Sequence, residues 1–147
     1  VTVAGGKAYF GHFGNQVLAV ELQTGAQLWQ SPDVGFPYLS SAALSGAALY
    51  IGARDRKLHA LRLADGKELW AFQALARVDA SPVTYGDVVL VGASDGRLYQ
   101  ISQQDGSLLW SYDLGAPITT SAAVVGAWIF VGTHDGAVYG LAAGAKP

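Results

Sequence analysis

The chain alternates short apolar runs with turn-forming residues along its whole length. Within residues 79–113 four such runs follow one another, "SPVTY", "DVVLVG", "RLYQIS" and "SLLWSY", separated by "YGD", "SDG" and "QDG". Short runs of β-branched and aromatic residues, bounded by Gly and Asp, are typical of antiparallel strands joined by tight turns. The 3.6-residue period of an amphipathic helix does not occur. The pattern therefore predicts an all-β chain of four-stranded meanders.

This pattern returns about every 40 residues. The stretch Gly-x-x-Leu-Trp occurs three times and ends at Trp29, Trp70 and Trp110. Apolar runs that end in glycine keep the same step, at Gly11, Gly52, Gly92 and Gly132. Four antiparallel strands in a period of about 40 residues form the blade of a β-propeller, whereas a helical solenoid would need the helical period.

The position of the repeated tryptophan distinguishes between kinds of propeller. The chain has no Trp-Asp pair, which marks WD40 repeats, and each repeated Trp lies four residues after a Gly in the expected fourth strand of its blade. This resembles the tryptophan-docking motif of pyrroloquinoline-quinone-like (PQQ-like) repeats, Ala-x-Asp-x-x-Thr-Gly-x-x-x-Trp, of the quinoprotein alcohol dehydrogenase type. The acid of the motif is replaced by Glu21, Arg62 and Ser102. Its Gly and Trp recur as Gly25 with Trp29, Gly66 with Trp70, and Gly106 with Trp110.

The physical chemistry of the indole gives this motif a structural role. An indole buries a large area and can stack flat on a peptide plane where the residue beneath has no Cβ. We therefore expect each repeated Trp to be largely buried between neighbouring blades, near the Gly four residues before it. These residues are not expected to form a ligand site.

PQQ-like propellers usually have seven or eight blades, and the chain accounts for about half of such a ring. Its repeats predict one propeller segment over residues 1–147, with blades at about 1–32, 38–74, 79–113 and 117–143. The fourth repeat has no Gly-x-x-Leu-Trp, so we expect fifteen strands, in three full blades and three strands of a fourth. A closed four-bladed ring and an eight-bladed ring of two copies are the alternatives.

Composition and charge narrow the class of partner. The chain has 147 residues, 51% hydrophobic and 14% charged, which is enough to bury a core. Nine Lys and Arg against eleven Asp and Glu give no basic surface for nucleic acid. The lack of Cys excludes disulfides, thiol catalysis and Cys-based metal sites. The chain also lacks a run of 18 apolar residues, so no transmembrane segment is predicted.

Strand order determines which loops share a face of the propeller. The loops between blades lie on the same side as those between second and third strands, and this side has the more varied side chains. Trp128 takes the position of Lys7, Ala48 and Val88 and is a candidate contact at the open end. It packs either against the third blade or against a missing blade or partner. The candidate interaction face comprises Phe13, Phe36, Tyr38, Arg54, Arg56, Arg77, Asp79 and His134.

Other candidate motifs favour structure over chemistry. His12, His59 and His134 occupy three different repeat positions, so no shared metal site is expected. The serines of "SSAAL", "ASPVT" and "TSAAV" have no His or acid at matching positions, which argues against a catalytic triad. Four Asp-Gly pairs lack the alternating oxygen ligands of a calcium loop and suit tight turns, at Asp65, Asp95, Asp105 and Asp135.

The PQQ-like resemblance implies three kinds of function. PQQ-dependent alcohol dehydrogenases need a full ring, a Ca²⁺ site of acidic and amide ligands and a catalytic Asp, and many have a Cys pair. This chain has no Cys and one Asn, Asn15. It is more similar to non-enzymatic relatives, namely the lipoprotein propeller of the bacterial outer-membrane β-barrel assembly machinery and the extracellular sensor propellers of some receptor kinases.

We therefore expect a non-catalytic scaffold for protein–protein interaction or assembly in the periplasm or outside the cell, with no cofactor or metal. The expected partners are other proteins, further blades of the same propeller or a second copy. A dehydrogenase fragment and a ligand-sensing receptor-kinase domain are the alternatives.

Overall fold

A computed structural model describes residues 1–142, which form fifteen strands and no helix. The first blade comprises β1 (Thr2–Ala4), β2 (Lys7–Gly11), β3 (Val17–Glu21) and β4 (Gln27–Gln30). The second comprises β5 (Ala43–Ser45), β6 (Ala48–Gly52), β7 (Lys57–Arg62) and β8 (Glu68–Gln73). The third comprises β9 (Val83–Tyr85), β10 (Val88–Gly92), β11 (Arg97–Ser102) and β12 (Leu108–Asp113). The fourth comprises β13 (Ala123–Val125), β14 (Trp128–Gly132) and β15 (Val138–Ala142).

Each blade is an antiparallel meander in which consecutive strands pair. Three blades have four strands, and the fourth has three strands within the described residues. The predicted all-β fold of partial propeller blades is therefore confirmed. A register shift between the third and fourth strands recurs in each four-stranded blade, and in the second blade it falls between Ala60 and Leu61.

The Asp-Gly pairs lie in turns. In the turn between β7 and β8 the Asp65 carboxylate accepts the amide hydrogen of Lys67, and in the next blade Asp105 accepts that of Ser107. The Asp95 and Asp135 carboxylates likewise accept a hydrogen bond from the main-chain amide two residues later. A carboxylate that bonds the main chain two residues on stabilises a tight turn, which agrees with the turn interpretation.

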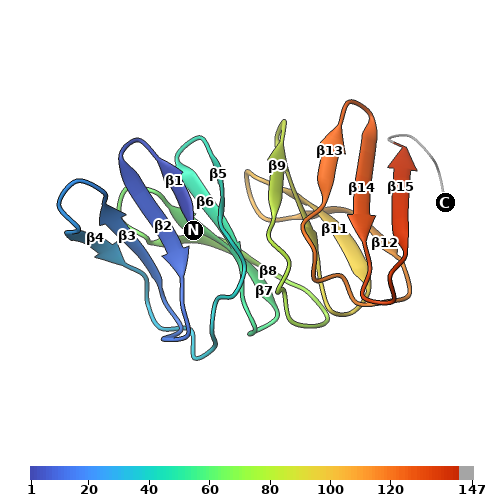
Figure 1. Ribbon diagram of the computed structural model, residues 1–147, viewed down its shortest axis with the longest axis horizontal. Coiled ribbons are helices and arrows are strands. Elements are labelled where there is room, and N and C mark those ends of the chain that lie inside the picture. Colours follow the sequence, from blue (N-terminus) through green and yellow to red (C-terminus); the bar gives the residue numbers. More distant parts are fainter. Residues whose placement is uncertain (143–147) are drawn as a thin grey trace.

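The four blades stand side by side in an open row (Figure 1). Their first strands β1, β5, β9 and β13 follow one another along one side of the molecule, and the first and fourth blades lie at its two ends. Within residues 1–142 the row does not close on itself, so the four-bladed ring considered as an alternative is not the structure that these residues form.

Polar bonds join neighbouring blades beside these first strands. The Ser41 amide donates to the Ser81 hydroxyl oxygen at 2.9 Å, and the Thr2 hydroxyl donates to the Ala42 carbonyl at 2.6 Å. Ser41 and Ser81 therefore join the second blade to the third, and Thr2 joins the first blade to the second.

The core lies between blades, and each blade has two distinct faces. Successive side chains of a strand point to opposite faces of its sheet. In the second blade Tyr50 and Leu58 pack against the third blade, whereas Leu49 and Ile51 pack against the first. We call these the forward and the backward face. The corresponding forward side chains are Tyr9 and Val17 in the first blade and Leu90 and Leu98 in the third; the backward ones are Val89, Val91, Ile129 and Val131.

Candidate functional site

Two of the repeated tryptophans dock on the following blade. The Trp29 indole lies over Gly66, where an added Cβ would come within 2.5 Å of the ring, and its Nε1–H donates to the Leu63 carbonyl at 2.9 Å. Trp70 repeats the arrangement one blade later, over Gly106 and with Gln103 as acceptor at 3.0 Å. The contact is thus between blades, as expected.

One detail of the docking prediction was wrong. The Trp29 and Trp70 indoles contact the glycine of the next blade, whereas an added Cβ at Gly25, four residues before Trp29, would meet nothing within 4 Å. All three repeated tryptophans pack against the core between blades and keep only a minor part of their surface exposed. The fourth strand is the outermost of its blade, which places its indole beside the turn of the neighbouring blade.

The main chain builds each docking site, which we define as the turn glycine together with the carbonyl three residues before it. The Gly66 amide donates to the Arg62 carbonyl at 2.8 Å and the Arg62 amide donates to the Lys67 carbonyl at 2.8 Å. These bonds hold Gly66 at a φ of 70°, which favours glycine. Replacement of the motif's acid by Arg62 therefore leaves the turn intact.

The third repeated tryptophan has a different environment. Trp110 stacks on Tyr112, with ring centroids 5.8 Å apart. The turn after β15, where the corresponding docking site would fall, lies outside the described residues.

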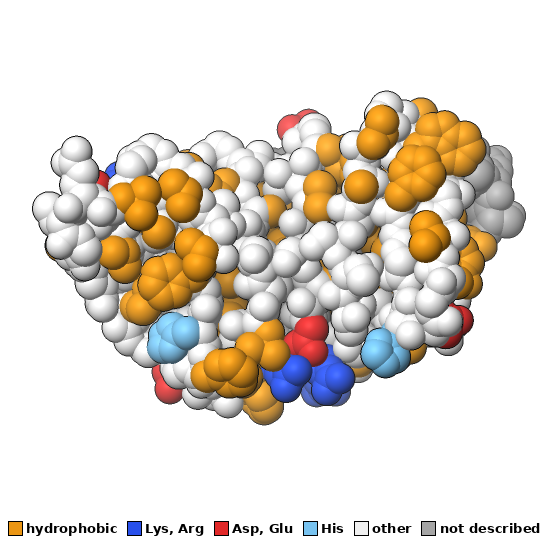
Figure 2. Space-filling model, viewed as in Figure 1, with side chains coloured by type: hydrophobic (Ala, Val, Ile, Leu, Met, Phe, Trp, Pro, Cys, Tyr) orange, Lys and Arg blue, Asp and Glu red, His pale blue; other side chains and the backbone are white. Residues whose placement is uncertain are grey.

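The loop side of the propeller carries a charged cluster between the second and third blades. Asp79 accepts a hydrogen bond from Arg54 Nε at 3.0 Å and forms an ion pair with Arg77, whose Nε lies 3.1 Å from the carboxylate. This carboxylate is largely shielded from solvent. Figure 2 shows charged side chains gathered at the lower edge of the molecule, with a histidine on each side. Within the candidate interaction face, the structure thus brings these three residues together.

Hydrogen bonds between loops order this surface. The Arg54 amide donates to the Pro37 carbonyl at 3.2 Å, and the Ser94 amide donates to the Arg77 carbonyl at 3.0 Å. In the fourth blade His134 makes the same bond to Pro117 at 2.8 Å. Each of these three loops between second and third strands is therefore bonded to the connection that enters its own blade.

The remaining residues of the candidate face differ in exposure. Phe13, Phe36, Arg56 and His134 are exposed. Tyr38 is only 2% exposed, so its side chain does not form part of this surface. It packs under Gly11, where an added Cβ would lie 2.2 Å from the Tyr38 Cβ.

The repeat itself contained a signal for the burial of Tyr38. Val78 and Ile118 make the corresponding contacts with Gly52 and Gly92, and both are fully buried. Apolar residues at the same step of the repeat therefore mark this position as core, although it lies in a connection rich in Gly and Pro.

A buried histidine lies between two carboxylates in the second blade. His59 is 2% exposed, with Nδ1 2.7 Å from a Glu68 oxygen and Nε2 3.0 Å from an Asp55 oxygen. A pocket of about 300 Å³ adjoins the cluster, and Tyr38 also lines it. The Tyr38 ring meets the imidazole edge to face, with centroids 5.5 Å apart.

Charge in this cluster changes several pKa values. Burial disfavours the protonated imidazole, but hydrogen bonds and charges from Asp55 and Glu68 outweigh it and raise the pKa of His59. Burial likewise opposes ionisation of Asp55, yet His59 lowers the pKa of this carboxyl overall. Burial and the nearby carboxylates raise the pKa of Tyr38.

The His59 cluster suits an ion-paired clamp better than a catalytic base. An imidazole donates from both nitrogens only when protonated, and here both nitrogens are already paired with carboxylates. Sequence reasoning missed this cluster. Its signal was the spacing of Asp55 and His59, which is repeated by Asp95 and Tyr99, where the Tyr99 hydroxyl donates to Asp95 at 2.7 Å.

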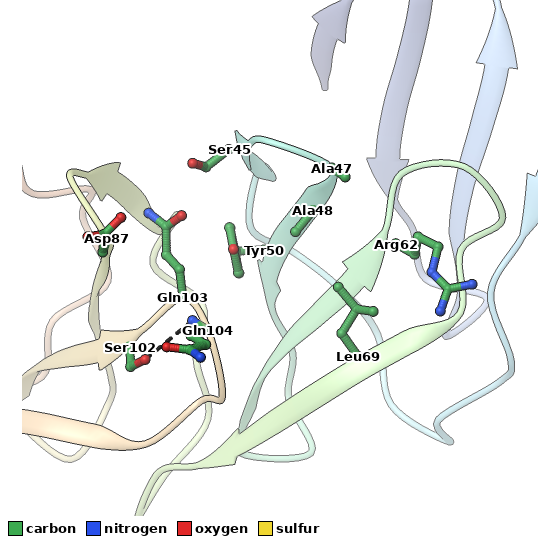
Figure 3. Close-up of a pocket in the computed structure, with 10 residues that line it drawn as sticks. All are labelled: Ser45, Ala47, Ala48, Tyr50, Arg62, Leu69, Asp87, Ser102, Gln103 and Gln104. Atoms are coloured by element: carbon green, nitrogen blue, oxygen red, sulfur yellow. Dashed lines mark hydrogen bonds between the residues drawn. The ribbon is translucent and has the colours of Figure 1, made fainter.

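A larger pocket, of about 590 Å³, lies between the second and third blades on the side opposite the loop face. Figure 3 shows Arg62 and Leu69 on one side of it and Asp87 and Gln103 on the other, with Tyr50 between them. Its lining has no pair of groups poised for acid–base chemistry, and the turns of both blades leave it open to solvent.

Residues 1–142 contain no group of three or more His, Cys, Asp or Glu side chains that could hold a metal ion. The same residues contain no helix that is long and apolar enough to cross a membrane.

Four-stranded blades whose outer tryptophans dock on the next blade define a PQQ-like β-propeller. The sequence model of one family in this class, described as outer membrane protein assembly factor BamB, matches residues 13–145. The chain belongs to this family.

Solved structures share the fold at low sequence identity. BamB from Moraxella catarrhalis superposes with a TM-score of 0.85 at 20% identity, over 95% of this chain and 47% of that one. The computationally designed Ika4 protein superposes with a TM-score of 0.83 at 18% identity, over 97% of this chain and 88% of that one. Quinohemoprotein alcohol dehydrogenase from Comamonas testosteroni superposes with a TM-score of 0.77 at 19% identity, over 90% of this chain and 28% of that one.

The family member of known structure is longer than this chain. This chain spans about half the length of the Moraxella BamB chain. No curated protein sequence matches it significantly.

Proposed function

We propose that the protein is a non-catalytic propeller scaffold that binds other proteins through its loop face, in the periplasm or outside the cell. The observation that carries the proposal is the juxtaposition of exposed aromatic side chains with the Arg54–Asp79–Arg77 cluster on hydrogen-bonded loops. Aromatic residues and Arg are enriched in protein–protein interfaces. Preordered loops also reduce the entropy lost on binding.

Charge indicates the chemistry of the partner surface. The loops of this face carry Arg54, Arg56 and Arg77 together with six carboxylates, those of Asp33, Asp55, Asp79, Asp95, Asp113 and Asp135. Its charge is therefore mixed and favours a partner segment that places both basic and acidic groups next to apolar side chains, because complementary charge guides encounter and excludes wrong partners.

Family membership supports an assembly role in the bacterial envelope. The family is described as an outer membrane protein assembly factor, and the match covers most of the chain. We infer that the partner is the β-barrel assembly machinery of the outer membrane, which the loop face would contact.

Binding to that machinery tests the proposal. The probe is the purified β-barrel assembly machinery stripped of its own propeller lipoprotein, titrated with the 147-residue chain in an optical biosensor. Phe36→Ser and Arg77→Glu should each weaken binding about tenfold or more, as expected for interface aromatic and Arg residues. Leu69→Ser is the matched control, because Leu69 is similarly exposed but lies on β8. Equal affinities for all three variants, or no binding by the wild type, would contradict the proposal.

The structural likeness to a quinohemoprotein alcohol dehydrogenase supports a second candidate, a fragment of a PQQ-dependent enzyme. Titration of the chain with PQQ and Ca²⁺, followed by quinone absorbance and equilibrium dialysis, distinguishes the two. The scaffold proposal expects no saturable quinone binding. A stoichiometric complex would favour the dehydrogenase instead.

A further inference from the structure

The first blade contains a tryptophan-docking site that no indole of the described residues fills. Gly25 has a φ of 71°, and a Cβ built there would meet no side chain or backbone within 4 Å beyond its chain neighbours. Its amide donates to the Glu21 carbonyl at 2.9 Å, as Gly66 donates to Arg62 at 2.8 Å. Leu22, whose carbonyl corresponds to the indole acceptor, is exposed. The site is therefore preformed in the geometry of the two occupied ones.

The forward face of the fourth blade is also uncovered. Trp128 and Phe130 are 49% and 43% exposed, and Val138 is 78% exposed. The residues at the same steps of the second blade include Tyr50 and Leu58, which are 2% and 0% exposed because the third blade covers them. Figure 2 shows large apolar side chains gathered over the end of the molecule formed by β13–β15. Trp128 thus points away from the third blade.

Trp128 gives the fourth blade an indole beside the aromatic residue of its second strand, as the docking tryptophan Trp70 lies beside the aromatic residue of the second strand in its own blade. In the second blade Trp70 lies against Tyr50, with centroids 5.6 Å apart. In the fourth blade Phe130 occupies the repeat position of Tyr50, and the Trp128 ring stacks on the Phe130 ring with centroids 6.2 Å apart. Both rings lie over Gly140, so the forward face presents an aromatic pair without a fourth strand among residues 1–142.

The open face of the fourth blade and the open face of the first blade are of the two types that pack together elsewhere in the molecule. Each of the three boundaries within the molecule joins a forward face to a backward face. The fourth blade exposes a forward face, and the first blade exposes a backward face with its docking site. These faces lie at opposite ends of the row, so one copy cannot join them (Figure 1).

We propose that two copies of the chain associate head to tail into a closed ring of eight blades. In each of its two identical junctions, the Trp128 indole of one copy occupies the docking site formed by Gly25 and Leu22 of the other. A head-to-tail contact that closes after two copies gives a dimer and leaves no unpaired face. The loop face used in the proposed function stays accessible, because it lies at the edge of the blades and not between them.

The molecular mass in solution tests this proposal. Sedimentation equilibrium of the 147-residue chain across micromolar concentrations should give twice the chain mass of 15.3 kDa. Trp128→Ser should raise the dimer dissociation constant by about 30-fold or more, as for a buried aromatic anchor. Phe13→Ser is the control, since Phe13 is an exposed aromatic residue outside both faces and its replacement should leave the mass unchanged.

A second pair of variants tests the docking site itself. Gly25→Gln places a side chain where the indole would lie, so it should likewise raise the dimer dissociation constant by about 30-fold or more. Gly115→Gln is its control, because Gly115 has a φ of 82° and equally open surroundings but lies in a loop between blades. Circular dichroism confirms that each variant is folded.

Three results would overturn the dimer: a single-chain mass for the wild type at the highest concentration, a mass that grows without limit as concentration rises, or equal dissociation constants for Trp128→Ser and Phe13→Ser. A change in mass with Phe36→Ser would also overturn it as stated, because the loop face and the junction would then be the same surface.

Discussion

Glycine and tryptophan act as a pair across each of the first two blade boundaries. Gly66 and Gly106 combine a positive φ with a lack of Cβ, and both properties are needed because an indole lies directly on the main chain. The sequence showed that these residues belong together. It could not show which glycine each tryptophan contacts, because a period of about 40 residues places one in the same blade and another in the next. Only the packing of the blades decides between them.

Gly106→Ala and Gly25→Ala should separate backbone strain from loss of docking. Both substitutions put Ala at a positive φ, which costs about 1–2 kcal/mol. At Gly106 the new Cβ would also lie 2.7 Å from the Trp70 ring, adding about 1–3 kcal/mol of overpacking. Urea unfolding at a concentration where the chain is monomeric measures both values. Equal losses would show that the indole contact contributes nothing.

The His59 cluster should make stability depend on pH. The pKa of His59 is raised above its ordinary value of 6.5 in the folded state, so its stabilisation is complete below pH 6.5 and is lost as the pH rises through the folded pKa. The pKa of Asp55 is lowered from 3.8, so its contribution is present above pH 3.8 and is lost as the pH falls through the lower folded value. Each unit of pKa difference corresponds to about 1.4 kcal/mol.

His59→Tyr tests this dependence, because Tyr99 pairs with Asp95 at the same step of the next blade. Unfolding free energies measured from mildly acidic to mildly alkaline pH should decline for the wild type and stay flatter for the variant. Tyr99→Phe is the control and should keep the wild-type slope. A wild-type slope in His59→Tyr would assign the pH dependence to another group.

At the scale of strands, residues at one step of the repeat share a conformation but differ in environment. Val17, Leu58 and Leu98 are fully buried, whereas Val138 at the same step of β15 is 78% exposed. The alternation of side chains predicts that all four lie on one face of their blades. It contains no information about whether another blade covers that face. For this reason the strands could be predicted from the sequence, while the uncovered face required the structure.

Leu98→Ala and Val138→Ala should therefore have unequal effects on the monomer. Truncation of the buried Leu98 removes packing between the third and fourth blades and should cost about 2–5 kcal/mol. Truncation of Val138 should change the unfolding free energy by less than about 0.5 kcal/mol, as is usual for surface positions. Chemical denaturation of dilute protein measures both. Similar losses would indicate that Val138 is covered in the monomer.

For the whole molecule, an open row means that stability is unequal along the chain. The second and third blades are covered on both faces, whereas the first and fourth are each covered on one. In repeat architectures, stability is close to a sum of the intrinsic stability of each unit and its contacts with neighbours. The end blades therefore have fewer stabilising contacts than the middle ones.

Hydrogen exchange should follow this order. Amides of β6, β7, β10 and β11 should exchange most slowly, and those of β1 and β15 fastest, because local opening requires the least free energy where few contacts are lost. Mass spectrometry of peptides from dilute protein measures the rates, and exchange at both ends should slow as concentration rises if the copies pair. Uniform rates along the chain would contradict an open row.

The forward direction of the tryptophan contact also affects how the protein is made. Trp29 bonds to a carbonyl 34 residues later in the chain, and Trp70 to one 33 residues later. A ribosome releases the chain from its N-terminus, so the partner of each indole emerges only after most of another blade has been translated. Each newly emerged blade thus secures the outer strand of the one before it. Folding during translation would therefore proceed blade by blade, with the most recent outer strand always the last to be fixed.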